Sequence, residues 1–116
     1  MSNKKMATID LKNFCTRIGG KVAKVFTGRD RGETVREKSK IDELYWQHGE
    51  ITVIIPPDTF SITPSFLEEF FTNIVKKYGV EQFRRTVHIV PNGYKIEGPL
   101  EEALERIMQD NNALSK

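Results

Sequence analysis

The stretch ITVIIPPDTFSITPSFLEEFF, residues 51–71, decides the fold class. Its first five residues are apolar or β-branched, a composition typical of a strand. An unbroken run of this kind predicts burial on both faces, as in a central strand with helices above and below it. Pro56 and Pro57 cannot donate hydrogen bonds to a strand ladder, so the strand is predicted to end there.

A helix is predicted directly after this strand. Apolar residues recur at helical spacing and form one broad stripe, made of Phe66, Leu67, Phe70, Phe71, Ile74, Val75 and Tyr78. Thr63 is a suitable N-cap, Pro64 suits the first helical position, and Gly79 can end the helix. In an alternative start, Ser65 is the cap and Glu68, three residues later, completes a capping box.

Further strands and helices alternate on both sides of this unit. Strands are predicted over Ala7–Leu11, Val22–Phe26, Thr86–Val90 and Tyr94–Ile96. Helices are predicted over Glu33–Gln47, with a restart near Ser39, over Val80–Arg85, and from Gly98 onward. Gly19 and Gly20 indicate a turn. The order predicts an α/β fold: a single mixed sheet of about four or five strands with flanking helices and at least one parallel pair.

Length and composition favour one small intracellular domain. A chain of 116 residues, 38% hydrophobic and 29% charged, fits a single domain over 1–116, with flexible ends at 1–6 and 109–116. Its one cysteine rules out an internal disulfide and favours a reducing compartment, so we expect a cytoplasmic protein. The longest nearly apolar run, residues 51–57, falls short of the about 20 residues that cross a bilayer. The sequence therefore predicts no membrane association.

The net charge of +2 is unevenly distributed along the chain. Residues 12–40 hold nine basic and three acidic side chains, whereas residues 97–110 hold five acidic side chains and one arginine. A concentrated basic region is typical of nucleic-acid binding, which we keep as an alternative function. The other interpretation is a solvated surface that complements the acidic segment, either within the fold or across a homodimer.

The residues that commonly carry catalysis are few. Nucleophilic catalysis needs a base beside the nucleophile, and the spacing of Cys15, His48 and His88 does not bring them together. Cys15 is expected to be a small buried hydrophobe. The sequence has no cluster of metal ligands and no phosphate-binding P-loop motif. We therefore predict a non-enzymatic protein with no catalytic residue, no metal and no cofactor.

An arginine-rich segment is the first candidate site. Gly28–Gly32 has no apolar residue and two glycines, so a loop is predicted. Arg29 and Arg31 in that loop, with Arg36 one turn into the next helix, could hold a phosphate, a nucleotide or a carboxylate of a partner. The other interpretation is a solvated loop tip in which Asp30 pairs with an arginine.

The crossing from the central strand to the following helix is the second candidate site. In open α/β sheets, ligands and partners gather beyond the carboxyl ends of the strands. Asp58, Ser61, Thr63 and Ser65 lie in this crossing and could form a partner surface. A hydroxyl at a helix N-terminus is also well placed for phosphorylation. The other interpretation is that Thr63 or Ser65 only caps the helix.

A family resemblance rests on two motifs in these same regions. Pro64–Phe71 after an apolar strand, with the earlier segment Thr27–Arg36, resembles the STAS-like family of small uncharacterised prokaryotic domains, which is distantly similar to anti-sigma-factor antagonists. That family has a Ser-Phe-Leu-Glu-Glu-like helix start after a strand and a Gly-Arg…Gly…Arg loop before its first helix. The resemblance covers residues 27–90 and implies a mixed sheet with flanking helices.

The resemblance also implies a regulatory role. In the antagonists, a partner kinase phosphorylates a serine at the start of a helix, which switches the protein that is bound. Ser65 falls at the matching position, but Thr63, Pro64 and Phe66 replace the acidic residue, small residues and glycine of the antagonist pattern. The resemblance thus implies a non-enzymatic regulatory or protein-interaction module whose partner is another protein, such as a kinase-like ATPase or a regulator.

Overall fold

The computed structural model describes residues 7–18 and 20–114. Its strands are β1 (Ala7–Asp10), β2 (Thr16–Ile18), β3 (Lys21–Ala23), β4 (Val25–Phe26), β5 (Ile51–Ile54), β6 (Ser61–Ile62) and β7 (Val87–Val90). Its helices are the short 3-10 helix η1 (Leu11–Phe14), α1 (Arg29–Ser39), α2 (Ile41–His48), α3 (Pro64–Tyr78), α4 (Val80–Thr86) and α5 (Glu97–Leu114).

Some predictions for the chain ends and the first turn concern residues outside this description. Residues 1–6 and 115–116, expected to be flexible, lie outside the described residues, as does Gly19 of the predicted glycine turn. Gly20 has a positive φ of 80°, which a glycine adopts without strain. The last helix continues past Gln109 to Leu114.

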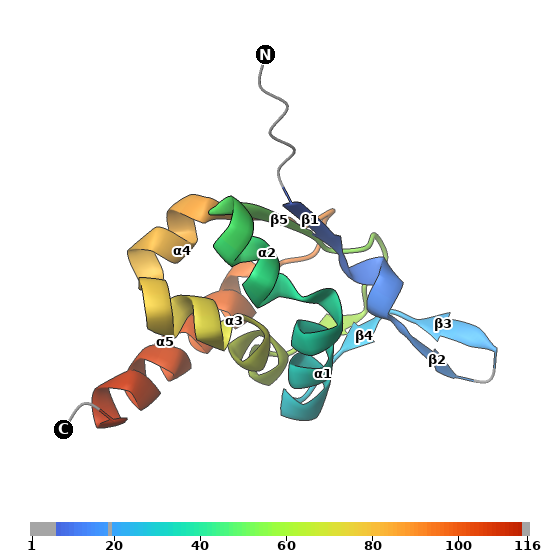
Figure 1. Cartoon of the computed structure of the whole chain (residues 1–116). Coiled ribbons are helices and arrows are strands. Elements are labelled where there is room, and N and C mark those ends of the chain that lie inside the picture. Colours follow the sequence, from blue (N-terminus) through green and yellow to red (C-terminus); the bar gives the residue numbers. More distant parts are fainter. Residues whose placement is uncertain (1–6, 19, 115–116) are drawn as a thin grey trace, which may run out of the picture.

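The strands form three small sheets. β1, β5 and β7 make a parallel three-stranded sheet with β5 in the centre. β2 and β3 form an antiparallel hairpin that projects from the fold (Figure 1), and β4 pairs with β6 in parallel. The α/β class is confirmed, but the predicted single mixed sheet of four or five strands is wrong. The predicted strand Val22–Phe26 is interrupted at Lys24, so its halves pair with different neighbours.

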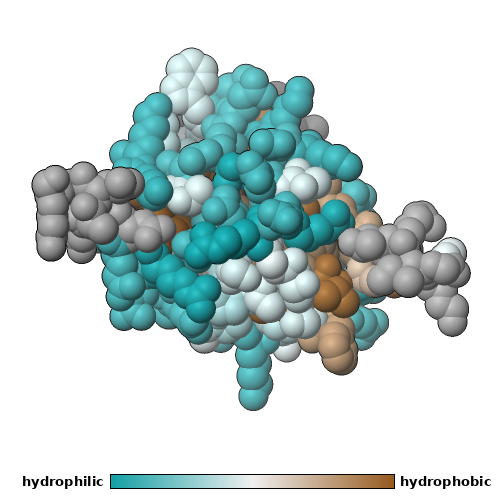
Figure 2. Space-filling view, turned by 90° about the horizontal axis from the view of Figure 1, so that it is seen from below, coloured by the Kyte–Doolittle hydropathy of each residue, from teal (hydrophilic) through white to brown (hydrophobic). Residues whose placement is uncertain are grey.

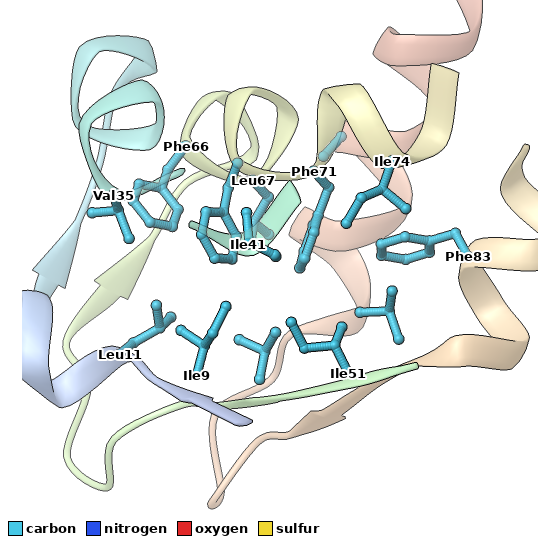
Figure 3. Close-up of a cluster of buried hydrophobic side chains, with 14 of the residues drawn as sticks. Ile9, Leu11, Val35, Ile41, Ile51, Phe66, Leu67, Phe71, Ile74 and Phe83 are labelled. Atoms are coloured by element: carbon cyan, nitrogen blue, oxygen red, sulfur yellow. The ribbon is translucent and has the colours of Figure 1, made fainter. Parts of the chain in front are cut away.

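The helices cover one face of the β1–β5–β7 sheet (Figure 3). In the central strand Ile51 and Val53 are buried, whereas Thr52 and Ile54 are half-buried. His88, which is aligned with Thr52, is exposed. The predicted burial of β5 on both faces is therefore wrong. The strand order β1–β5–β7 follows the chain without a reversal. Right-handed crossovers that run in one direction across a sheet place their helices on the same face, which explains why the other face is left open.

Helix α3 is the centre of the core, and its predicted ends are confirmed. The Thr63 hydroxyl accepts a hydrogen bond from the Phe66 amide at 3.4 Å, Pro64 is the first residue, and Gly79 ends the helix. Phe66, Leu67, Phe71 and Ile74 point towards Ile9 and Ile51 of the sheet (Figure 3). The rings of Phe71 and Phe83 lie 4.8 Å apart in an edge-on contact that joins α3 to α4.

Residues 29–48 form two helices, whereas the sequence predicts a loop followed by one helix. The predicted loop Gly28–Gly32 is wrong, because α1 begins at Arg29. The predicted helix Glu33–Gln47 is divided at Lys40, whose φ of 58° ends α1 before α2 begins. A Cβ atom built at Gly32 would lie 2.5 Å from the Phe66 carbonyl oxygen. Glycine therefore lets α1 lie directly on the backbone of α3.

The C-terminal third largely follows the predicted pattern. α4, β7 and α5 are confirmed, and α5 packs against α3. The predicted return strand Tyr94–Ile96 is wrong, because this segment forms no ladder. Instead, the Tyr94 hydroxyl accepts a hydrogen bond from the Ile62 amide at 2.8 Å. Among the described residues, no helix has the length and apolar character needed to cross a membrane.

Candidate partner-binding site

The crossing from β5 to α3 makes a sharp bend at the carboxyl end of the central strand. Ile55 and Pro56 are buried, and Pro57 and Asp58 then emerge into solvent. Asp58 adopts a φ of 66°, a left-handed conformation that aspartate tolerates better than most side chains. The chain returns as β6 and enters α3, so the bend lies between a rigid strand and a rigid helix.

Hydrogen bonds from three directions hold this bend. The Thr59 hydroxyl donates to the Pro56 carbonyl at 2.6 Å, and the Phe60 amide donates to the Lys24 carbonyl at 2.9 Å. The Asn92 side-chain amide donates to the Ile55 carbonyl at 2.7 Å. These hydrogen bonds fix the backbone of the bend and so set the direction in which each side chain leaves it.

Phe60 is the most exposed of the large hydrophobic side chains in the described part of the chain. The residue is 83% exposed although its backbone amide is hydrogen-bonded. Figure 2, a view from below, shows hydrophobic side chains gathered on the side of the molecule that carries the β2–β3 hairpin, while hydrophilic side chains cover most of the rest. An exposed aromatic ring on a hydrogen-bonded backbone is a suitable anchor for a partner.

A groove of about 510 Å³ lies beside the bend. Asp58 and Thr59 form one wall, and the turn that follows β7 forms the other with Asn92, Tyr94 and Lys95. The ends of β5 and β7 meet here because the two strands are parallel neighbours. The groove therefore brings together an acidic, a basic and several uncharged polar side chains at one edge of the sheet.

The predicted hydroxyl residues occupy different positions around the bend. Ser61 is half-buried in β6, where its strand pairs with Val25. The Thr63 hydroxyl accepts from the Phe66 amide and also from the Gly28 amide at 3.1 Å, so one side chain joins the starts of α1 and α3. The Ser65 hydroxyl is half-buried and lies 3.2 Å from that of Thr63.

Two of the three predicted arginines pair with acids of this chain. Arg29 lies 3.2 Å from the Glu68 carboxylate, which is 4% exposed, and 3.6 Å from Glu69. Arg36 pairs with the Glu69 carboxylate at 3.1 Å and lies 3.9 Å from Asp42. These contacts join α1 to α3 and α2, and they neutralise part of the basic charge of residues 12–40.

Arg31 lies in a different environment from the other two arginines. Its guanidinium donates to the Phe14 carbonyl and faces η1. The structure therefore places Arg29 and Arg36 over the acids of α3, and Arg31 beside the N-terminal 3-10 helix. Arg106 of α5 also reaches Glu68, at 3.7 Å, a contact that the sequence analysis did not predict.

The cysteine and the strand histidine have separate partners. The Cys15 thiol is half-buried and lies 3.8 Å from the Leu11 carbonyl. Burial raises the pKa of this thiol, and the nearby charges of Lys24 and Arg31 offset that effect in part. His88 contacts the Glu50 carboxylate on the open face of the sheet.

Sequence reasoning missed the second wall of the groove. Pro91, Asn92 and Gly93 lie in the turn that follows β7, but only the structure places the Asn92 side chain against β5 and the Tyr94 hydroxyl against β6. An asparagine–glycine pair is typical of a turn, but it does not indicate which distant segments the turn will contact.

Comparison with protein-family models, with curated proteins and with solved structures gives no match to this chain. The resemblance to the STAS-like family therefore stays a prediction, and so do the functional roles that it implies.

Proposed function

We propose that this chain is a non-enzymatic protein-interaction module that binds a regulatory protein partner through the bend of residues 56–60 and the adjoining groove. The observation that carries this proposal is the 83% exposure of Phe60 on a backbone fixed by hydrogen bonds. An aromatic side chain on a rigid bend loses little conformational entropy on binding, and burying it removes a large apolar area from water.

The polar groups of the groove complement this anchor. Asp58 and Lys95 supply one charge of each sign, and Asn92 and Tyr94 hold the walls in place. An exposed aromatic ring surrounded by polar groups corresponds to the anchor and rim that interfaces commonly have. The groove therefore suits the surface of a folded protein or an extended peptide segment.

Ser65 is the proposed regulatory position of this module. It lies in the first turn of α3, where the helix dipole favours added negative charge. Glu68 and Glu69 follow within one turn, and both pair with Arg29. A phosphate on Ser65 would compete with these carboxylates for the arginine and would change the charge next to the partner surface.

Site-specific photo-crosslinking in the native cell tests the partner surface. A photoreactive phenylalanine analogue at position 60 should crosslink to one defined protein, whereas the same analogue at position 46 should not. Trp46 is the matched control, since it is also an exposed aromatic residue, at 71%, but lies on α2. Phe60→Ser should abolish co-purification of that protein and Trp46→Ser should retain it. The proposal fails if position 60 gives no specific crosslink, or if only Trp46→Ser loses the partner.

Ser65→Glu tests the regulatory position with the same partner. The added charge should change the amount of partner that co-purifies, whereas Ser65→Ala should leave it close to that of the unsubstituted chain. If neither variant alters partner binding, Ser65 has no regulatory role, although the partner surface itself would still stand.

A further inference from the structure

A small basic pocket lies between η1 and one face of α1. Its volume is about 170 Å³, and Asn13, Cys15, Arg31, Thr34 and Lys38 contribute to its walls. The three α1 residues recur at helical spacing, so they share the face of α1 that is turned towards η1. None of the described residues that line this pocket is acidic.

The guanidinium of Arg31 is held in place within this pocket. It donates to the Phe14 carbonyl, which fixes the side chain. Its Nε atom is shielded from solvent and has no hydrogen-bond partner among the described residues. A buried N–H group without an acceptor is costly, so this guanidinium keeps hydrogen-bonding capacity that the described residues do not fill.

Lys38 supplies the second positive charge. It is exposed, and no ion pair with it is found among residues 7–18 and 20–114. The nearby carboxylate of Asp10 lies 3.8 Å from the Lys12 ammonium and accepts a hydrogen bond from the Lys12 amide. The two cations of the pocket are therefore not neutralised in the way that Arg29 and Arg36 are.

We propose that this pocket binds a single phosphoryl group, either as inorganic phosphate or as the phosphate of a phosphorylated side chain. Two cations and the neutral polar groups of Asn13 and Thr34 match the charge and the several acceptor oxygens of a phosphate. Pockets that enclose whole small molecules measure about 300–1,000 Å³, so this one suits the phosphoryl group but not a complete nucleotide. The site shares no residue with the partner surface at residues 56–60, and the two proposals fail independently.

Titration of the whole chain with inorganic phosphate tests the site. At constant ionic strength and pH 7.5, phosphate should raise the melting temperature along a saturating curve in the millimolar range, because a ligand of the native state stabilises it. Chloride should give no such curve. Lys38→Gln should weaken the apparent phosphate affinity about tenfold, and Lys76→Gln, the same change on an exposed face of α3, should leave it unchanged. Phosphate also stabilises proteins without a site, but that effect does not saturate and would be equal in both variants.

The single cysteine reports where the phosphate binds. Cys15 lines the pocket, so saturating phosphate should slow its alkylation by iodoacetamide at least twofold in the unsubstituted chain and not in Lys38→Gln. The proposal is overturned if the phosphate response does not saturate, if Lys76→Gln weakens it as much as Lys38→Gln, or if the alkylation rate is unaffected by phosphate.

A short phosphoserine peptide distinguishes the two sources of the phosphoryl group. Tighter binding of the peptide than of inorganic phosphate, with no binding of the unphosphorylated peptide, assigns the site to a modified protein. Equal or weaker binding of the peptide assigns it to free phosphate. Binding of the unphosphorylated peptide with the same affinity contradicts a phosphoryl site.

Discussion

Replacing Gly32 by alanine tests the close contact between α1 and α3. The added Cβ atom would lie 2.5 Å from the Phe66 carbonyl oxygen and 2.8 Å from the Glu69 Cβ atom, whereas ordinary contacts begin at 3.4 Å. The helices would have to separate by about 0.9 Å, the difference between the first distance and that limit. Backbone and Cβ atoms of packed helices cannot move aside on their own, so the strain spreads into the core.

The magnitude follows from two opposed effects. Overpacking of a tight interior contact typically costs about 1–3 kcal/mol, and the upper end applies because the obstacle is backbone. The higher helix propensity of alanine stabilises the helix by about 1 kcal/mol and offsets part of this cost. We therefore expect Gly32→Ala to lower the free energy of unfolding by about 2 kcal/mol. For a chain of this size the melting temperature should fall by roughly 8 °C.

Urea unfolding followed by circular dichroism measures this change, with Gly98→Ala as the matched control. Gly98 is also helical, and no atom other than those of its chain neighbours lies within 4 Å of its added Cβ. Contact of this Cβ with the ring of Pro99 offsets the gain in helix propensity, so the substitution should change stability by less than about 1 kcal/mol. If Gly32→Ala proves as stable as the unsubstituted chain, the close approach of α1 and α3 is wrong. The account of α1 as a helix packed on α3 would then fail with it.

Three further predictions concern single hydrogen bonds and ionisable groups. Thr63→Val removes the hydroxyl that accepts hydrogen bonds from the Gly28 and Phe66 amides at the starts of α1 and α3. This substitution should lower the free energy of unfolding in urea by about 2 kcal/mol, whereas Thr63→Ser, which keeps a hydroxyl, should lower it far less. Equal losses in the two variants would contradict the shared cap. Because burial raises the pKa of the Cys15 thiol, alkylation at pH 8 should be slower in the native protein than in the urea-unfolded chain, and equal rates would refute this. The hydrogen bonds from Arg84 lower the pKa of Glu101, so the pair stabilises the fold above the ordinary carboxyl pKa and loses that contribution as the pH falls through the lowered value. Glu101→Gln should therefore cost less than about 1 kcal/mol at pH 7, and this cost should shrink progressively as the pH falls below the ordinary carboxyl pKa. A cost that does not change with pH would point to packing instead.

Local signals explain which elements were predictable. The ends of α3 follow from Thr63, Pro64 and Gly79, each of which acts within one turn of the helix. The strand β5 follows from its β-branched composition. In both cases neighbouring residues carry the information, so no knowledge of distant contacts was needed.

The failures depend on contacts between distant segments. Residues 28–32 have the composition of a loop, and the advantage of a helix there is the fit of Gly32 against α3. One face of the sheet is open because successive crossovers run in the same direction across it. The residues of β5 alone carry no information about that direction. The crossing was predictable as a candidate site from its place after a strand, whereas the contribution of Asn92 depends on the pairing of β5 with β7.

The parallel pairing of β1, β5 and β7 has a consequence for the order of assembly. The paired segments of this sheet follow one another at intervals of about forty residues, so each of its two strand pairings needs a long loop to close. Helix α3 can begin to form as soon as its own residues leave the ribosome. The middle strand gains its second neighbour only after residue 90 has emerged, and until then one whole side of it offers unpaired amides and carbonyls to any other extended chain.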